Sequence, residues 1–265
     1  MPKPTRYQRI IEQIFLSRFK PGAESISFER EAIVRAAKKL GVKLPKNLGD
    51  VVYSFRYRAD LPRSVRDKAP AGKEWIIRPA GTSRYKFELV AHAEILPNQM
   101  LAEIKVPDST SGIIAMYALN DEQALLAKLR YNRLIDLFTG ITCYSLQSHL
   151  RTNVQDVGQV ETDEVYVGVD RRGAHYVFPV QAKGGSDVLS VVQIEQDFAM
   201  CAAKFPNLIC RPIGAQFMAD DLIALFEFER VEGVVAISHE RHYRLVPPDA
   251  ISAEELKTYR YRSEE

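Results

Sequence analysis

Residues 158–185 read GQVETDEVYVGVDRRGAHYVFPVQAKGG. Two runs in this stretch, residues 159–169 and residues 175–182, are rich in Val, Tyr and Phe. The segment between them, residues 170–173, reads DRRG and is typical of a turn. Together these features predict two antiparallel strands that form a β-hairpin.

Polar side chains gather at one end of the predicted hairpin. We take Arg172 as the centre of the turn, so that the strands pair symmetrically about it. Asp163 then lies opposite Gln181. By the same symmetry Glu161 lies opposite Lys183. Because side chains alternate across a strand, these four groups share one face, at the end of the hairpin away from its turn.

This polar end has the chemistry of a metal-dependent hydrolase. Carboxylate and amide oxygens are hard ligands of the kind that Mg²⁺ prefers. A neighbouring lysine can steer or deprotonate an attacking water. The stretch resembles the PD-(D/E)xK nuclease superfamily, in which an acidic residue on one strand is followed by (D/E)xK on the next. Asp163 matches the first acidic residue, and the run from Gln181 to Lys183 matches the tripeptide.

The resemblance implies a set of catalytic and metal-binding residues. The catalytic residues would be Asp163, Gln181, Lys183 and Glu161. Asp163, Gln181 and the backbone carbonyl of Ala182 would bind Mg²⁺, with Mn²⁺ as a substitute. Gln181 departs from the acidic consensus, and one fewer negative charge should weaken metal binding.

An ordinary structural role for the same residues stays open. In this alternative Glu161 and Lys183 form a cross-strand salt bridge, and Asp163 is a surface residue. Glu164 should face the other side of the sheet, and we interpret it as structural.

The composition bounds the class of protein. The chain has 265 residues, 46% of them hydrophobic, and a formal net charge of +2, so DNA contacts have to come from local patches. Cys143, Cys201 and Cys210 are odd in number and lack CxxC spacing, which favours reduced thiols. No run approaches the ~18 apolar residues of a membrane helix, and the N-terminus lacks an apolar signal core. We therefore expect a cytoplasmic protein without membrane contact.

The first 91 residues have the element order of a DNA-binding domain. Helical periodicity predicts a helix at 6–19, a second that Ser27 caps, and a third that Asn47 caps. Two strand-like runs follow, at 74–78 and 84–90. Three helices followed by a hairpin resemble a winged helix, in which the third helix enters the major groove and the hairpin forms the wing.

Four basic residues are candidates for DNA contacts in this domain. They are Arg56, Arg58, Arg84 and Lys86, because Arg and Lys supply most hydrogen bonds to phosphates and groove edges. The alternative is a solvated basic face on an interaction domain. Trp75 is expected in the core.

A second domain follows a linker. We assign residues 1–91 to the winged-helix-like domain, 92–112 to the linker and 113–265 to a nuclease domain. A long helix is predicted at 121–138, and Glu122 in its first turn is most simply a capping residue that the helix dipole favours. In related nucleases a helical Glu sometimes joins the metal site, so Glu122 is a further candidate.

The remaining elements complete the predicted α/β fold. A helix at 187–205 carries Gln193, a position where relatives often place a Gln near the site, although a surface helix residue is the favoured interpretation. A strand at 207–215, a helix at 221–229 and a strand at 231–237 follow. With the hairpin they predict the α/β/α restriction-endonuclease-like core, beside a smaller α+β domain.

The pair His239 and His242 suggests a metal site, but the HExxH spacing and a third ligand are absent. We interpret this segment as a loop or strand edge. A short polar helix is predicted after Ser252.

These observations favour a Mg²⁺-dependent DNA endonuclease that most resembles a type II restriction enzyme. One site per chain and two strands to cut predict a homodimer on double-stranded DNA. Two rival functions remain: a repair or junction-resolving nuclease, and a DNA-binding regulator whose nuclease core is inactive.

Overall fold

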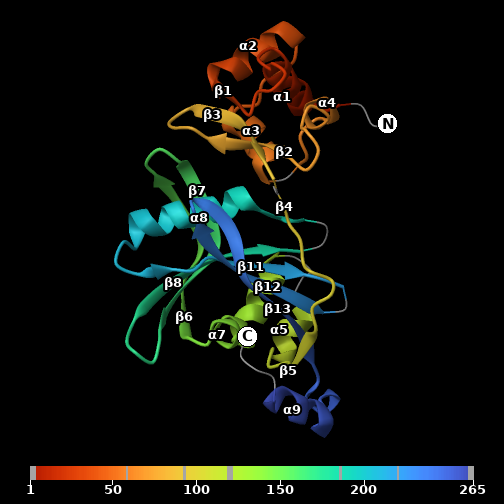
Figure 1. Cartoon of the computed structure of the whole chain (residues 1–265), viewed down its shortest axis with the longest axis vertical. Coiled ribbons are helices and arrows are strands. Elements are labelled where there is room, and N and C mark those ends of the chain that lie inside the picture. Colours follow the sequence, from red (N-terminus) through yellow and green to blue (C-terminus); the bar gives the residue numbers. More distant parts are fainter. Residues whose placement is uncertain are drawn as a thin grey trace. The chain divides into compact units, whose positions relative to one another are not determined.

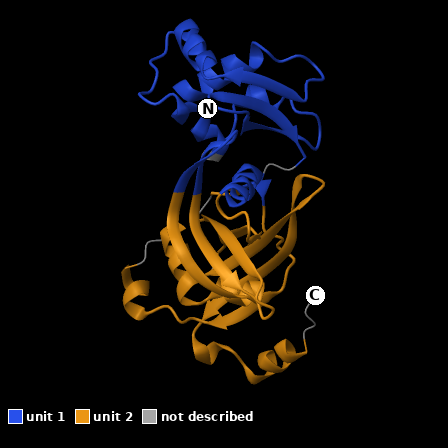
Figure 2. Cartoon of the chain, turned by 90° about the vertical axis from the view of Figure 1, so that its left-hand side faces the viewer, with its two compact units in different colours: residues 1–95, 151–161, 190–203 blue, residues 96–150, 162–189, 204–265 orange. Residues whose placement is uncertain are grey.

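The chain is a mixed α/β protein with one large mixed sheet. The computed structural model describes residues 4–57, 59–91, 94–117, 122–184, 187–219 and 221–261. Two compact units are coloured separately in Figure 2. Unit 1 comprises Met1–Ile95, Arg151–Glu161 and Ser190–Ala203, and unit 2 comprises Leu96–Leu150, Thr162–Leu189 and Lys204–Glu265. The domain boundaries expected at 1–91, 92–112 and 113–265 stay a prediction.

Unit 1 is built on a three-stranded antiparallel sheet in the order β1-β3-β2. Most of helix α8, which comes much later in the chain, also belongs to this unit. Its elements are α1 (Arg6–Leu16), β1 (Ser25–Glu29), α2 (Glu31–Leu40), α3 (Gly49–Tyr57), α4 (Arg63–Arg66), β2 (Glu74–Pro79), β3 (Arg84–Val90), β4 (Glu94–Ile95) and α8 (Val191–Lys204).

The core of unit 1 is an aromatic cluster against α1. The ring of Phe15 lies 5.1 Å from the rings of both Trp75 and Phe87. All three side chains are buried, which confirms the core position expected for Trp75. Thr5 fixes the start of α1, because its hydroxyl accepts a hydrogen bond from the Gln8 N–H at 3.2 Å.

The predicted second helix begins too early. Ser27 lies inside β1, where Ile26 and Phe28 are buried and their neighbours are exposed. This alternation with period two is that of a half-buried strand, so the helix α2 begins only at Glu31. Asn47 does stand before α3 as predicted, since its Oδ1 accepts from the Gly49 N–H at 3.0 Å.

Unit 2 is organised on an eight-stranded sheet, of which β5-β13-β12-β11-β8-β7-β6 are neighbours and β10 pairs with β8 (Figure 1). Residues Arg151–Glu161, which include the end of β6 and the start of β7, belong to unit 1. Its elements are β5 (Glu103–Pro107), α5 (Gly112–Tyr117), α6 (Glu122–Tyr131), α7 (Leu134–Thr139), β6 (Thr142–Val154), β7 (Gly158–Val169), β8 (His175–Lys183), β9 (Leu189–Ser190), β10 (Ile209–Cys210), β11 (Ile213–Phe217), β12 (Leu222–Val231), β13 (Val234–Val246), the 3₁₀ helix η1 (Pro248–Ala250) and α9 (Ala253–Arg260).

Helices α6 and α7 pack on one face of this sheet. Leu125 and Leu129 of α6 and Ile135 of α7 join one buried cluster with Val180 and Ala182 of β8. The leucines recur at helical spacing and so line one side of α6. The face of the hairpin that carries Val180 and Ala182 is therefore part of the core of unit 2, and Gln181 lies on the other face.

The single helix predicted at 121–138 is wrong, because the segment forms two helices, α6 and α7. Arg133 has φ 50° and ψ 39°, a left-handed conformation that ends α6 and precedes α7. Asn132 explains the break, because its buried amide donates to the Lys128 carbonyl and to Asp108 and its oxygen accepts from the Ser109 N–H. The first residue of that predicted helix, Asp121, lies outside the described residues.

The segment 221–229, predicted as a helix, is instead strand β12 from Leu222 onward. Its residues are buried on both faces from Leu222 to Phe228, because β12 lies inside the sheet between β11 and β13. A strand buried on both faces has no alternation to distinguish it from a buried helix. The histidines at 239 and 242 lie within strand β13, so a loop is wrong for both. His242 has a neighbouring strand on each side, whereas His239 pairs with β12 alone and lies at a strand edge, as predicted.

Other predicted elements are confirmed. Strands β2 and β3 match the runs at 74–78 and 84–90. The C-terminal helix α9 begins after Ser252, whose hydroxyl accepts from the Glu255 N–H at 3.1 Å. Among the described residues no helix is long and apolar enough to cross a membrane.

Gly168 of β7 is expected to tolerate no side chain. A Cβ there would lie 2.9 Å from Ile141, 3.0 Å from Phe178 and 3.2 Å from Cys143. Gly168→Ala should therefore lower the free energy of unfolding by about 1–3 kcal/mol, as overpacking of a core does. Urea denaturation measures the change. Gly112→Ala is the control, since its added methyl meets nothing within 4 Å, and an equal loss in both variants would contradict the prediction.

Candidate active site

The β7–β8 hairpin has the predicted register. Its ladder runs from Val169 opposite His175 to Glu164 opposite Val180, symmetric about Arg172. This ladder confirms the predicted register from residue 164 to residue 180. The pairs expected beyond it, Asp163 with Gln181 and Glu161 with Lys183, stay predictions.

The turn of the hairpin is stabilised by Asp170. Its carboxylate accepts hydrogen bonds from the N–H groups of Arg172 at 2.8 Å and Ala174 at 2.9 Å, and from the Tyr176 hydroxyl at 3.1 Å. The donation from Ala174, together with the other bonds, lowers the pKa of Asp170 to about 2. Gly173 has φ 82°, a left-handed conformation that suits glycine.

Asp163 is attached to the opposite strand. Its Oδ2 accepts a hydrogen bond from the Ala182 backbone N–H at 2.8 Å. Burial raises the pKa of the Asp163 carboxyl, and the negative charge of Glu122 adds to the effect, although Ala182 and Lys183 oppose it. The neighbours of Asp163 thus offset only part of the cost of burying its negative charge.

Lys183 makes an ion pair with Glu122. Its Nζ lies 3.0 Å from Oε1 of Glu122, the first residue of α6. The lysine is buried, with 10% of its side chain exposed, whereas 41% of the Glu122 side chain is exposed. Glu122, Asp163 and Lys183 therefore form one electrostatically coupled group at the end of the hairpin.

Two glutamines border this group. Gln181 is 1% exposed and lies beside Gly214 of the parallel strand β11. Gln216 lies beside Lys183 in the same ladder and is 7% exposed. Its Nε2 donates to the Asp187 carbonyl at 2.8 Å, and its Oε1 is buried without a hydrogen-bond partner in the described part of the chain. A buried acceptor without a donor is costly and suits a site that binds a cation or water.

No family model, curated protein or solved structure matches this chain. The functional assignment therefore rests on the geometry and chemistry of its own residues.

Gln216 and His149 were not predicted from the sequence as neighbours of the candidate site. Gln216 follows the predicted strand at 207–215, and its place beside Lys183 depends on the pairing of β8 with β11, for which the sequence carries no signal. His149, exposed on β6, acts on Asp163 through its charge and opposes the rise in the carboxyl pKa. Strand β6 was not among the predicted elements.

Glu161 has a partner of its own. Its Oε1 lies 2.9 Å from Nη2 of Arg151, so the structure joins Glu161 to Arg151 and Lys183 to Glu122. Gln193 accepts a hydrogen bond from the Ser190 N–H at 3.3 Å, at the start of α8. Catalytic roles for Glu161 and Gln193, and metal binding by the Ala182 carbonyl, stay predictions.

Glu164 faces the other side of the sheet, as the sequence predicted. It is 0% exposed and accepts from Nε and Nη2 of Arg130 at 3.1 and 2.9 Å, with the Ser145 hydroxyl as a further donor. Such a buried and hydrogen-bonded ion pair is costly to break by removing one partner. Arg130 therefore holds Glu164 in the core of unit 2.

The four candidate DNA-binding residues differ in their surroundings. Arg56 is half-buried on α3, and Arg84 is exposed at the start of β3. Lys86 pairs with Glu88 at 2.9 Å, which reduces its free positive charge. Arg58 lies outside the described residues.

Clusters of three or more His, Cys, Asp or Glu side chains fit to hold a metal ion are absent from the described residues. His242 is buried, and its Nε2 lies 2.8 Å from Glu240 Oε1. Glu240 also accepts from the Asn98 N–H at 2.8 Å, so this His–Glu pair has a structural role. Any metal site at the hairpin would thus combine carboxylates with amide oxygens.

Asp163→Asn should raise the melting temperature at pH 7. The pKa of Asp163 in the folded protein is raised above its ordinary value of 3.8. The protonated carboxyl therefore contributes its full stability below pH 3.8, and this contribution is lost as the pH rises through the pKa of the folded state. The ionised carboxylate is therefore destabilising at pH 7, and asparagine cannot ionise. Thermal melts from pH 7 downward should show a gain that shrinks towards pH 3.8.

Asp170→Asn is the control of opposite sign. The pKa of Asp170 is lowered, so its stabilisation is complete above its ordinary value of 3.8 and is lost as the pH falls through about 2. Asp170→Asn should lower the melting temperature at pH 7. A loss of similar sign in Asp163→Asn would show that the Asp163 carboxylate serves the fold.

Proposed function

We propose that this chain is a Mg²⁺-dependent DNA endonuclease of the PD-(D/E)xK type that cleaves duplex DNA in a sequence-specific, restriction-like manner. The observation that supports it best is the ion pair of Lys183 with Glu122 beside the Asp163 carboxylate. Hydrolysis of a phosphodiester needs a positioned water, a proton acceptor and positive charge near the phosphate. This group supplies a lysine and two carboxylates at the end of one hairpin.

Each residue has a distinct part in the proposed reaction. Lys183, held by Glu122, orients the attacking water and attracts the oxygens of the scissile phosphate. Glu122 holds the lysine through the ion pair, and 41% of the Glu122 side chain is exposed. Asp163 is fixed by the Ala182 N–H, so its second oxygen is oriented without the entropy cost of a mobile side chain.

The donor atoms fit Mg²⁺. Mg²⁺ is commonly bound by one or two carboxylates, with water completing its coordination. Asp163 and Glu122 supply the carboxylates, Gln181 supplies an amide, and the unpartnered Oε1 of Gln216 supplies a further buried oxygen. When bound, the metal polarises the phosphoryl oxygen and lowers the pKa of its water. Mn²⁺ prefers similar ligands and is expected to substitute.

Unit 1 is proposed as the part that reads DNA. The order α1, β1, α2, α3, α4, β2 and β3, with the sheet order β1-β3-β2, supports a winged-helix-like domain. Arg56 on α3 and Arg84 and Lys86 on β3 are its proposed contacts to the groove and phosphates. Cleavage of both strands by one site per chain favours a homodimer.

A DNA-binding regulator with an inactive core is the second candidate. It is favoured by Gln181, which stands where the family pattern has an acidic residue and is 1% exposed. A repair or junction-resolving nuclease would use the same group of residues on branched DNA. Cleavage assays on mixed plasmid DNA and on branched DNA, with the fragment ends sequenced, separate the three functions.

Lys183→Met should abolish cleavage and leave the fold intact. Loss of the group that positions the water should slow cleavage by at least about 100-fold. The lost ion pair with Glu122, together with the lost positive charge near the buried Asp163, should lower the free energy of unfolding by about 1–3 kcal/mol. Cleavage of plasmid DNA in Mg²⁺ and thermal melting measure the two effects.

Lys128→Met is the matched control. Lys128 lies on α6 and pairs with Asp221 at 2.7 Å, so the substitution also removes an ion pair but lies outside the proposed site. Its cleavage rate should equal that of the parent. Equal rates for all three proteins would end the assignment of Lys183, and a parent that cuts no DNA would favour the regulator.

Gln181→Glu tests the residue that departs from the family pattern. The change adds a charged oxygen ligand of nearly the same size, so half-maximal cleavage should need less Mg²⁺. Gln181→Leu should lose activity. The test is cleavage by the parent and both variants, measured against Mg²⁺ concentration. Three identical curves would show that Gln181 takes no part in the reaction.

A further inference from the structure

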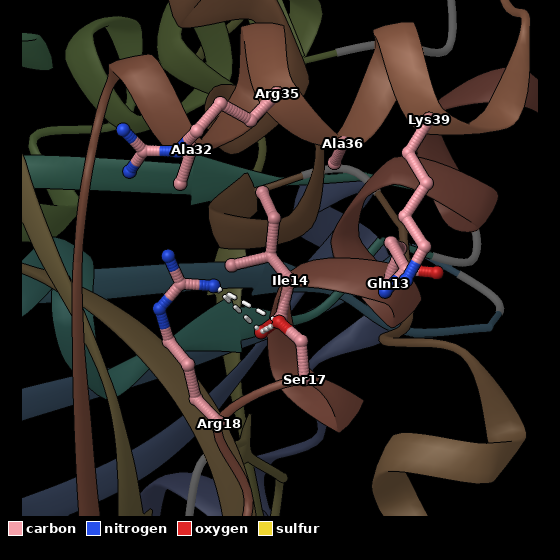
Figure 3. Close-up of a pocket in the computed structure, with 8 residues that line it drawn as sticks. All are labelled: Gln13, Ile14, Ser17, Arg18, Ala32, Arg35, Ala36 and Lys39. Carbon is pink, nitrogen blue, oxygen red and sulfur yellow. Dashed lines mark hydrogen bonds between the residues drawn. The ribbon is translucent and has the colours of Figure 1, made fainter.

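A cleft of about 180 Å³ opens between α1 and α2 of unit 1 (Figure 3). It is remote in sequence from the β7–β8 hairpin, and its lining residues are not among the proposed DNA contacts. The side chains that border it are Gln13, Ile14, Ser17, Arg18, Ala32, Arg35, Ala36 and Lys39.

Short side chains leave the space of the cleft. Ala32 and Ala36 are four residues apart on α2 and are both buried, so they lie on the same side of that helix. Ile14 of α1 is 1% exposed. A longer side chain at either alanine would reach toward α1 and fill the gap.

The rim of the cleft is cationic. Arg18, Arg35 and Lys39 border it, and none of the described residues that line it is acidic. Within the described residues none of these three forms an ion pair with a carboxylate, although Glu31 stands one turn before Arg35 on α2. Like charges one turn apart, such as Arg35 and Lys39, are mildly destabilising in a helix. The fold thus gathers three positive charges that no described carboxylate neutralises.

Arg18 is held in place at the end of α1. Its Nη1 donates to the Ile14 carbonyl at 3.2 Å and to the Ser17 hydroxyl at 3.1 Å. Figure 3 shows the guanidinium groups of Arg18 and Arg35 on the same side of Ile14, while Lys39 is drawn on the side of Gln13. Two guanidinium groups with remaining N–H donors therefore border one space.

We propose that this cleft binds a phosphate group between Arg18 and Arg35, with Lys39 and the Ser17 hydroxyl at its edge. Guanidinium groups bind phosphate oxygens with pairs of short, charge-assisted hydrogen bonds. The fixed position of Arg18 reduces the entropy cost of binding. Burial and the charge of Arg35 both lower the pKa of Arg18, and a bound anion would relieve that repulsion.

The phosphate can belong to a free phosphate compound or to a DNA backbone. Pyrophosphate titrated into the full-length protein by calorimetry is the probe for the first source. A duplex DNA of random sequence at low salt is the probe for the second. Arg35→Gln is the test variant, because Arg35 makes no ion pair in the described structure and its loss should leave the melting temperature unchanged or higher.

Lys38→Gln is the matched control. Lys38 is exposed on the same helix, and the change removes the same charge without touching the cleft. Arg35→Gln should weaken the binding of pyrophosphate about tenfold or more, as expected for the loss of a charge-assisted pair, whereas Lys38→Gln should change it less than about twofold.

The two sources give different patterns. An effect of Arg35→Gln on pyrophosphate alone identifies a free phosphate compound, and an effect on duplex binding as well identifies the DNA backbone. Two results would overturn the proposal. One is that the parent binds neither probe. The other is that Arg35→Gln and Lys38→Gln weaken binding equally, which would show only diffuse attraction to a basic surface.

Discussion

The hydrogen bonds of Asp170 fix the register of β7 against β8, and the candidate site depends on that register. Asp163 and Glu164 are adjacent in sequence and face opposite sides of the sheet. A slip of one residue would exchange them, so that Glu164 would lie toward Lys183 and Asp163 would enter the core. A surface turn far along the hairpin thus decides which carboxylate is available to chemistry.

The two adjacent carboxylates also differ in how their charge is compensated. Glu164 is fully buried, but Arg130 and Ser145 donate to it. Asp163 has one backbone donor and shares Lys183 with Glu122, and its pKa is raised. A carboxylate that is destabilising when ionised gains more from a bound cation than one that is already paired. The proposed metal therefore belongs on the Asp163 side of the strand.

The sequence predicted local structure well where short-range patterns decide it. The hairpin register from residue 164 to residue 180 followed from taking Arg172 as the centre of the turn, and the core position of Trp75 was also predicted. Prediction failed where distant pairing decides the structure: β12 is buried on both faces, and Asn132 interrupts a helix through bonds to residues some twenty positions away. Gln216 could not be placed for the same reason, since only the pairing of β11 with β8 brings it beside Lys183.

The parallel pairing of β8 with β11 has a consequence for the order of folding. Hairpin strands meet through a short turn, whereas parallel strands need a long crossover, here one that contains α8. Loop closure over such a distance costs more chain entropy and is slower. Asp163, Gln181 and Lys183 can therefore come together early, while Gln216 and Glu122 arrive only with long-range packing. A newly made chain would therefore hold an incomplete candidate site until most of unit 2 has folded.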